Sequence, residues 1–105
     1  MTHLHPLDAR RLLDEQDSFV LLDVREPWEY NHCRLEDAVH IPLGVLPLRL
    51  AELDPSVPHL VYCHHGSRSV FACRVMEKAG FTNVYNLYGG INAWSDLVDQ
   101  RVKKY

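Results

Sequence analysis

The sequence predicts an α/β protein in which a parallel β-sheet is covered by helices on both faces. Short apolar runs rich in β-branched residues, typical of strands buried on both faces, alternate along the chain with amphipathic segments. Parallel strands need crossover connections, and helices between the strands supply them. Open sheets of this class bind ligands at the carboxyl ends of their strands. We therefore expect one site at that edge of the sheet.

Four segments are predicted to be strands. Residues 19–24 form the clearest one, a continuous apolar run that reads FVLLDV. Residues 59–63 and 83–87 have the same character, and residues 38–41 are a shorter and weaker case. These four runs are expected to build the sheet.

Five segments are predicted to be helical: residues 7–16, 27–32, 43–53, 67–79 and 91–98. Pro27 suits the first turn of the second helix, whereas Pro47 should bend or delay the third. The fourth helix is the strongest, because it ends at Gly80 and carries a broad apolar side made of Val70, Phe71, Cys73, Val75 and Met76. Residues 101–105 are expected to be a frayed tail.

The composition is that of an ordinary folded domain. Of 105 residues, 47% are hydrophobic and 24% are charged, so we expect a single domain over residues 1–105. The formal net charge of −3 offers no basic surface for a nucleic acid. The longest apolar runs fall far below the roughly 20 residues of a membrane span, and His3 and His5 interrupt any signal-peptide pattern. We predict a soluble, cytoplasmic protein that binds neither nucleic acid nor membrane.

Three cysteines, Cys33, Cys63 and Cys73, cannot all pair within one chain, and none lies in a CxxC motif. This count argues against a disulfide framework and for a reducing compartment. Cys73 lies on the apolar side of the helix over residues 67–79 and is interpreted as core. Cys33 follows the helix over residues 27–32, from where it could approach Cys63 and resolve an oxidised or persulfidated form.

The candidate site is the loop between a buried strand and the strongest helix: Cys63, His64, His65, Gly66, Ser67, Arg68 and Ser69. The free N–H groups of a helix N-terminus stabilise a thiolate and can bind an anion beside it. Arg68 adds a full positive charge, and Gly66 lets the backbone turn its N–H groups inward. We therefore predict that Cys63 is a reactive nucleophile near neutral pH. The plainer alternative is that Cys63 is a small buried residue beside a merely polar loop.

Residues 63–68 fit the pattern CxxGxR and resemble the active-site loop of rhodanese-like sulfurtransferases. The resemblance covers nearly the whole chain, since matching motifs follow in order at residues 22–25, Glu29-Tyr30, residues 38–42 and residues 80–94. It implies a rhodanese-like fold, a five-stranded parallel sheet with helices on both faces. It also implies that Cys63 accepts a sulfane sulfur from thiosulfate or a persulfide donor and passes it to a thiophilic acceptor.

Under this interpretation the other loop residues, His64 to Ser69, bind the substrate. Donor and acceptor can each be a small molecule or a protein. We expect neither a cofactor nor a metal. Consecutive side chains on a loop diverge, and no fourth ligand at zinc spacing follows His64 and His65.

One stretch departs from the family pattern. Where such proteins read Gly-His-Ile-x-Gly-Ala, this chain has Cys33-Arg34-Leu35-Glu36-Asp37-Ala38. The register is kept, but both glycines and the histidine are replaced.

Loop length separates two chemistries on this kind of fold. Cysteine phosphatases of the cell-division-cycle type and arsenate reductases place five residues between cysteine and arginine, whereas four, His64 to Ser67, lie between Cys63 and Arg68. A tetrahedral phosphate needs a wider ring of N–H groups than a terminal sulfur does. The sequence thus favours sulfur transfer, with a phosphatase or arsenate reductase as one alternative. A non-catalytic protein-binding module is the other, and the presence of Cys63 argues against it.

Several neighbouring side chains carry weaker expectations. His64 and His65 line the entrance and tune the charge of the donor, or are solvated surface. Ser69 is expected to cap the helix rather than to bond the sulfur.

Two further expectations concern residues outside the loop. Asp23 and Arg25 end a strand and could reach the site, although an ion pair with Glu29 is the favoured use of Arg25. Trp28 and Trp94 are expected to pack in the core or between helices.

Overall fold

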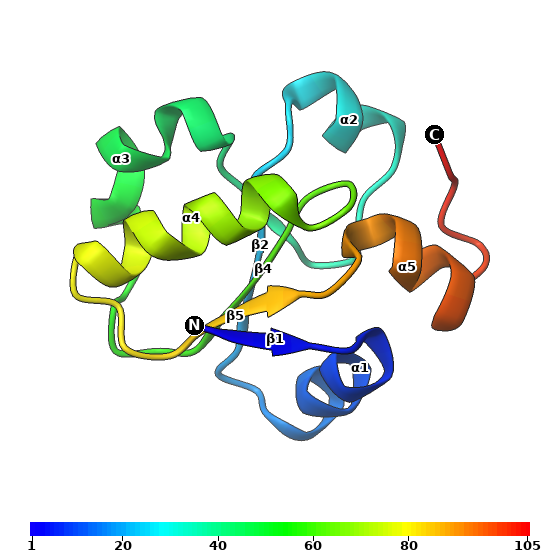
Figure 1. Cartoon of the computed structure of the whole chain (residues 1–105), viewed down its shortest axis with the longest axis horizontal. Coiled ribbons are helices and arrows are strands. Elements are labelled where there is room, and N and C mark those ends of the chain that lie inside the picture. The colour runs from blue at the N-terminus through cyan, green and yellow to red at the C-terminus, as the bar shows by residue number, and fades with distance from the viewer.

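The computed structural model describes residues 1–105, in which a five-stranded sheet separates two layers of helices (Figure 1). The strands are β1 (Thr2–Leu4), β2 (Val20–Asp23), β3 (Val39–His40), β4 (His59–Tyr62) and β5 (Val84–Leu87). The helices are α1 (Pro6–Glu15), α2 (Pro27–His32), α3 (Leu46–Arg49), α4 (Ser67–Lys78) and α5 (Gly90–Leu97). All neighbouring strands are parallel, in the order β1-β5-β4-β2-β3. The predicted fold class is confirmed.

The two faces of the sheet bury separate apolar clusters. On the face covered by α3 and α4, strand residues such as Leu22 and Val61 pack against Ala72 and Met76. The opposite face lies under α1 and α5, where Leu60 belongs to a cluster with Ala9, Leu21, Leu35, Tyr62, Leu87, Ile91 and Trp94. Every residue of β4 is buried, because this strand lies at the centre of the sheet with a layer on each side.

Strand β1 was not predicted from the sequence. Its three residues, Thr2 to Leu4, include only one large apolar side chain, so they show no apolar run. The strand forms because the edge of β5 is free to pair, in a register that sets His3 beside Asn86. Pairing with the rest of the sheet, not local pattern, makes this segment a strand.

The segment with Pro47 is broken, as expected. It consists of a 3₁₀ turn over Leu43–Val45, the short helix α3, and a second 3₁₀ turn over Leu50–Glu52. Pro47 lies in the first turn of α3, where its missing N–H group costs nothing.

The apolar side predicted for α4 was too broad. This helix buries Ala72, Cys73 and Met76, but Phe71 is 59% exposed. The helix packs on the sheet with a narrower stripe than its composition suggested, because Phe71 lies outside the face turned to the sheet.

Two expectations about aromatic residues and the tail were wrong. Trp28 is 63% exposed rather than part of the core, whereas Trp94 is buried as expected. Residues 101–105 are not a frayed tail, because Ser95 donates a hydrogen bond to the Val102 carbonyl and Tyr105 is bound to several side chains of other elements. In Figure 1 the chain leaves α5 and returns toward α2.

The stretch that departs from the family pattern still makes a left-handed turn. Asp37, at the position of the second glycine, has a φ of 64° and is the one non-glycine residue with a positive φ. Aspartate tolerates this conformation better than most residues do. The turn is therefore kept without glycine.

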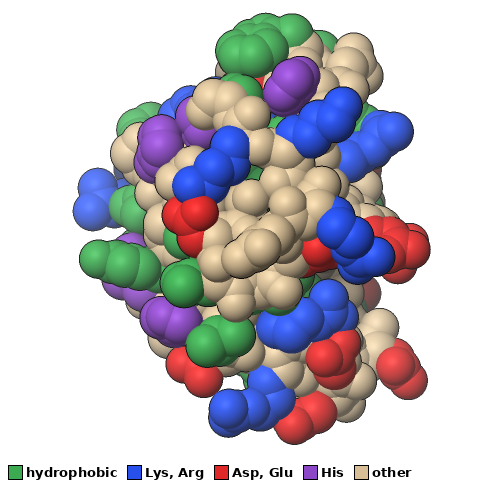
Figure 2. All heavy atoms as spheres, turned by 90° about the vertical axis from the view of Figure 1, so that its right-hand side faces the viewer, with side chains coloured by type: hydrophobic (Ala, Val, Ile, Leu, Met, Phe, Trp, Pro, Cys, Tyr) green, Lys and Arg blue, Asp and Glu red, His purple; other side chains and the backbone are tan.

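The outer surface carries both signs of charge. Figure 2 views the side that bears α5 and the C-terminal end, and Lys and Arg side chains there are interspersed with Asp and Glu. None of the helices is both long enough and apolar enough to cross a membrane.

Candidate functional site

Cys63 directly follows β4, at the carboxyl edge of the central strand, and α4 begins four residues later. The loop between them ends at Gly66, which is the N-cap of α4 and has a φ of 111°. A side chain would be strained in this conformation. The local sequence thus makes a sharp strand-to-helix turn that leaves Cys63 beside the first turn of α4.

Three groups of the loop surround the sulfur of Cys63. The backbone N–H of Gly66 donates to Sγ at 3.1 Å, and the N–H of Ser69 donates at 3.3 Å. The Ser69 hydroxyl lies 3.3 Å from the same sulfur. Cys63 itself is buried. These donors converge on one sulfur at the N-terminus of α4, where they can hydrogen-bond to a negatively charged atom.

Helix α5 holds the outer side of this loop. The N–H groups of Ile91 and Asn92 donate to the carbonyls of Cys63 and His64 at 2.9 and 3.1 Å. Gly90 makes the approach possible, since a Cβ there would overlap both carbonyl oxygens. The carbonyl groups of Cys63 and His64 are thus bound to α5, while the N–H groups of Gly66 and Ser69 point toward the sulfur.

Arg68 is bound to Glu29 of α2. Its two terminal nitrogens donate to the two carboxylate oxygens at 2.6 and 2.8 Å. The sequence predicted that Arg68 adds a full positive charge to the site. In the structure this charge is paired with the carboxylate of Glu29.

Tyr105 and Arg25 extend this arrangement away from the loop. The Tyr105 hydroxyl donates to Glu29 at 2.6 Å and accepts from Arg25 at 2.8 Å. Arg25 in turn donates to Asp23 at 2.7 Å, with both side chains fully buried. We call Asp23, Arg25, Glu29, Arg68 and Tyr105 the charged network.

The ion pairs of the charged network differ from those predicted. Arg25 pairs with Asp23, and Glu29 pairs with Arg68, so the expected pair of Arg25 with Glu29 does not form. Burial opposes the ionisation of Glu29, but the bonds from Arg68, Tyr105 and the Glu26 N–H outweigh it and lower its pKa to about 2. Glu29 is therefore an anion throughout the physiological range.

A second set of side chains reaches Cys63 from the other side and carries no ion pair. The Ser69 hydroxyl donates to the Asn86 side-chain oxygen at 2.5 Å, and the Asn86 amide donates to Nδ1 of His3 at 3.1 Å. We call Ser69, Asn86 and His3 the neutral network. The expectation that Ser69 caps α4 was wrong, because Gly66 is the N-cap and the Ser69 hydroxyl lies beside the sulfur.

His64 and His65 stack on one another at the outer end of the loop. Their ring centroids are 3.9 Å apart, and His64 also stacks on Tyr105 at 3.8 Å. Burial and the neighbouring His65 lower the pKa of His64, and its buried Nε2 has no hydrogen-bond partner. His65 and Ser67 are exposed beside a hollow of about 360 Å³, which Tyr88 also lines.

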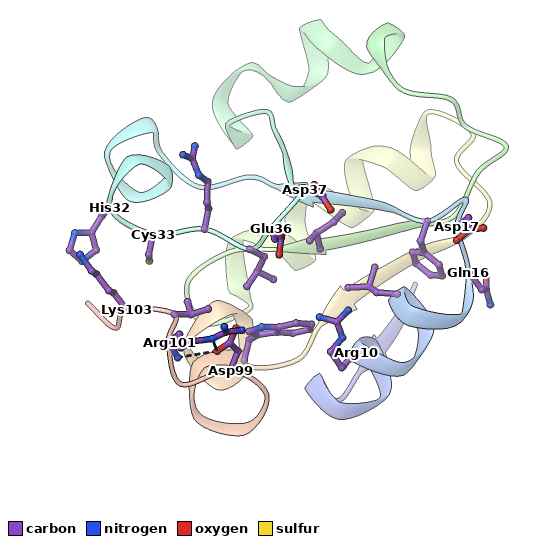
Figure 3. A pocket seen from close by; sticks show the side chains of 17 residues that line it. Arg10, Gln16, Asp17, His32, Cys33, Glu36, Asp37, Asp99, Arg101 and Lys103 are labelled. Carbon is purple, nitrogen blue, oxygen red and sulfur yellow. Dashed lines mark hydrogen bonds and ion pairs between the residues drawn. The ribbon is translucent and has the colours of Figure 1, made fainter.

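The thiols of the other two cysteines have hydrogen-bond partners other than Cys63, namely Arg25 for Cys33 and the Tyr85 carbonyl for Cys73. Cys73 is buried in the core cluster under α4, as expected, and burial raises the pKa of its thiol to about 12. Cys33 lines a larger cavity of about 840 Å³ (Figure 3). That cavity lies between α1, Trp94 of α5 and the tail, and no residue of the loop over 63–69 lines it. No group of three or more His, Cys, Asp or Glu side chains is arranged to hold a metal ion.

Sequence reasoning missed the roles of Glu29, Tyr105, Asn86 and His3. Asn86 carried a signal, since a polar side chain inside a strand that is otherwise buried must find a partner. Tyr105 carried none, because its partners lie up to 80 residues away along the chain.

The fold and the site define an α/β protein with a cysteine loop between the central strand of a parallel sheet and a helix N-terminus. Comparison with known proteins agrees, since residues 5–97 match the family of the rhodanese-like domain. The chain belongs to the rhodanese-like family, and the resemblance noted in its sequence is confirmed.

Relatives of the chain carry names from sulfur chemistry. A sulfurtransferase of Allochromatium vinosum is 36% identical over 87 residues, which are 83% of this chain and 80% of that protein. The thiosulfate sulfurtransferase GlpE of Coxiella burnetii is 33% identical over 88 residues, or 84% and 81% of the two chains. A rhodanese-related protein of Thermoplasma volcanium superposes with a TM-score of 0.83 at 26% identity, covering 91% of this chain and 92% of that one.

Proposed function

We propose that this protein is a sulfurtransferase that carries a sulfane sulfur as a persulfide on Cys63. The observation that carries the proposal is the convergence of two backbone N–H groups and one hydroxyl on Sγ of Cys63, all within 3.3 Å. Such a ring fits one sulfur anion. Only four residues lie between Cys63 and Arg68, one fewer than in the phosphatases and arsenate reductases considered above, which supports sulfur rather than phosphoryl chemistry.

The first half of the reaction loads the cysteine. The Cys63 thiolate attacks the outer sulfur of thiosulfate, the S–S bond of thiosulfate breaks, and sulfite leaves with the bonding electrons. The product is Cys63–S–S⁻. The partial positive charge at the N-terminus of α4 offsets the negative charges of thiosulfate and of the Cys63 persulfide.

The second half unloads it. A thiophilic acceptor such as cyanide attacks the terminal sulfur, the persulfide bond breaks, and its electrons return to Cys63 as a thiolate. Thiocyanate leaves with the transferred sulfur. No oxidant or reductant is consumed, and the enzyme returns to its starting state.

Loop residues have distinct roles in this proposal. Gly66 and Ser69 bind the sulfur, Ser67 begins the helix whose N-terminus faces the donor, and Arg68 fixes the loop to α2 through Glu29. His64 and His65 form the outer wall of the site. The hollow beside His65 and Ser67 has room for a small donor or for the end of a protein chain that carries a persulfide.

A reducing compartment such as the cytoplasm fits this chemistry, because Cys63 must be a free thiol before each turnover. The physiological partners belong to the same proposal. The donor is a small molecule or a protein that carries sulfane sulfur, and the acceptor is a thiophilic small molecule or protein.

Intact mass measurement tests the proposal. After incubation with thiosulfate, the purified protein should gain one sulfur atom, a reductant should remove it, and peptide mapping should locate it on Cys63. The Cys63→Ser variant should gain nothing. A protein that gains no sulfur, or gains it on Cys33, would contradict the proposal, as would rapid hydrolysis of an activated aryl phosphate.

A further inference from the structure

The Ser69 hydroxyl has one proton and three acceptors within reach. The Asn86 side-chain oxygen lies at 2.5 Å, the Gly66 carbonyl at 3.1 Å and Sγ of Cys63 at 3.3 Å. A hydroxyl donates to one acceptor at a time and can turn between them. Its direction therefore depends on which acceptor is strongest.

Asn86 competes with the sulfur for the hydroxyl proton of Ser69. It lies in the middle of β5, 2% exposed, with Val61 of β4 and His3 of β1 beside it in register. Its amide nitrogen can only donate, so Nδ1 of His3 must accept, which fixes the amide with its oxygen toward Ser69. His3 thereby decides which end of Asn86 faces the site.

The charge on the sulfur decides the outcome of this competition. When Cys63 is a thiol, its S–H can donate to the Ser69 oxygen while the hydroxyl donates to Asn86. When the sulfur is an anion it has no proton to give, and it is a stronger acceptor than an amide oxygen. The hydroxyl then gains more by turning to Sγ.

We propose that Asn86 is a positioning residue that holds the Ser69 hydroxyl proton while the Cys63 sulfur is uncharged and releases it to the sulfur when the sulfur is an anion. The proposal rests on the proposed function for its role in turnover. It rests on the geometry of the neutral network alone for its effect on the thiol.

Sulfur transfer would turn the hydroxyl twice per cycle. In the loaded state the charge of Cys63–S–S⁻ lies on the terminal sulfur, so Sγ is uncharged and the hydroxyl returns to Asn86. When the acceptor takes the terminal sulfur, Sγ regains its charge and the hydroxyl donates to it again. The same donor thus stabilises Sγ as the nucleophile and as the leaving group, with no proton lost to solvent.

The other charged and titratable groups near the loop do not take this role. Arg68 is bound through both terminal nitrogens to Glu29. His64 and His65 stack on each other and on Tyr105, at the outer end of the loop. The groups hydrogen-bonded to Sγ are the N–H groups of Gly66 and Ser69, which are fixed, and the Ser69 hydroxyl, which can turn.

Titration of the Cys63 thiolate by its ultraviolet absorbance tests the proposal. The titration is done in a Cys33→Ser background, which removes the partly exposed thiol of Cys33. Cys73 can stay, because burial raises the pKa of its thiol to about 12 and it does not ionise near neutral pH. Ser69→Ala removes the donor and should move the titration midpoint about one pH unit higher. Asn86→Leu, similar in shape, removes the competing acceptor and should move it about half a unit lower.

The decisive measurement combines the two changes. If Asn86 acts through Ser69, Asn86→Leu should shift the midpoint in the presence of Ser69 and leave it unchanged in the Ser69→Ala background. His3→Leu, on an exposed edge where folding is not at risk, frees the Asn86 amide to turn over and should shift the midpoint in the same direction by a smaller amount. That shift should also vanish without the Ser69 hydroxyl.

Equal shifts with and without Ser69 would overturn the proposal, as would no shift in either Asn86→Leu or His3→Leu. The outcomes separate this inference from the proposed function, because the titration needs no sulfur donor. A chain that transfers no sulfur but shows the Ser69-dependent shifts refutes the proposed function alone. A chain that transfers sulfur but shows no such shifts refutes this inference alone.

Discussion

The two networks that flank Cys63 differ in charge and in their distance from the sulfur. The charged network consists of two ion pairs, Arg25 with Asp23 and Arg68 with Glu29, joined by the Tyr105 hydroxyl. The groups within hydrogen-bond distance of Sγ are instead the N–H groups of Gly66 and Ser69 and the Ser69 hydroxyl. The neutral network reaches the sulfur directly through Ser69. In this site the ion pairs join the surrounding elements, whereas uncharged donors bind Sγ of Cys63.

A physical reason favours this division. Buried charges stabilise a fold only when their geometry is fixed and their hydrogen bonds are satisfied, so the charged network has to be rigid. Arg25 meets this condition by donating to Asp23, Tyr105 and the Cys33 carbonyl. A hydroxyl and an amide can change direction at much lower cost, and the proposed function needs that freedom beside a sulfur that gains and loses charge.

The substitution Cys63→Ser should have the largest effect, because it removes the sulfur that lies between the two networks and that we propose to be the reacting atom. Sulfur transfer from thiosulfate to cyanide should be abolished, because a serine alkoxide is too rare at neutral pH to replace a thiolate. The matched change Cys73→Ser affects a buried core thiol and should leave the specific activity largely intact. Residual transfer by folded Cys63→Ser would show that another atom reacts.

Lengthening the loop should have the next largest effect, because it widens the ring without changing either network's charges. A glycine inserted between Gly66 and Ser67 places five residues between Cys63 and Arg68. We expect sulfur transfer to fall and phosphate or arsenate to bind more tightly. Steady-state transfer and anion binding measure both effects, after circular dichroism has shown that the variant is folded. Full transfer activity with no new anion affinity would mean that loop length does not select the substrate.

Acid should weaken the charged network by protonating Glu29. The pKa of Glu29 is lowered to about 2 from an ordinary value of 4.5, so its contribution to stability is complete above pH 4.5 and is lost as the pH falls toward 2. That contribution amounts to about 3 kcal/mol. Urea unfolding of the wild type and of Glu29→Gln across this range should show a steeper loss in the wild type. Parallel curves would show that Glu29 does not couple folding to protonation.

Removing one hydroxyl from the charged network should cost less. Tyr105→Phe keeps the ring that stacks on His64 but loses the bonds to Glu29 and Arg25. We expect a loss of about 1 to 2 kcal/mol in the free energy of unfolding. Tyr88→Phe is the control, since Tyr88 is largely exposed. Equal stabilities of the two variants would show that the tail is not held by the Tyr105 hydroxyl.

The smallest expected effect lies at the opposite end of β4, away from both networks. His59 is fully buried, and burial lowers its pKa below 6.5. The unfolded chain therefore takes up this proton more readily, and stability should decrease as the pH falls below 6.5. Thermal unfolding between pH 7 and 5 should show a smaller decrease for His59→Leu, with sulfur transfer at neutral pH unchanged. A pH dependence as steep as that of the wild type would exclude His59 as its source.

Local patterns determined most of the fold and the centre of the site. Apolar runs identified four strands because burial on both faces requires such runs, and Pro27 and Gly80 marked helix ends through their backbone restrictions. The loop could be predicted for the same reason, since Cys63, Gly66 and the start of α4 are joined by a few residues. Chain connectivity alone brings the helix N-terminus to the sulfur.

Only the tertiary structure decided which partners complete the site. Glu29 meets Arg68 across 39 residues, Asn86 meets His3 across 83, and Tyr105 returns from the tail to Arg25 across 80. Arg25 could have paired with Glu29, four residues away, but the fold gives it Asp23 and gives Glu29 to Arg68. Such choices depend on the packing of whole elements, because a buried charge or amide takes the partner that the sheet and helices bring within hydrogen-bond distance, and no local pattern encodes that geometry.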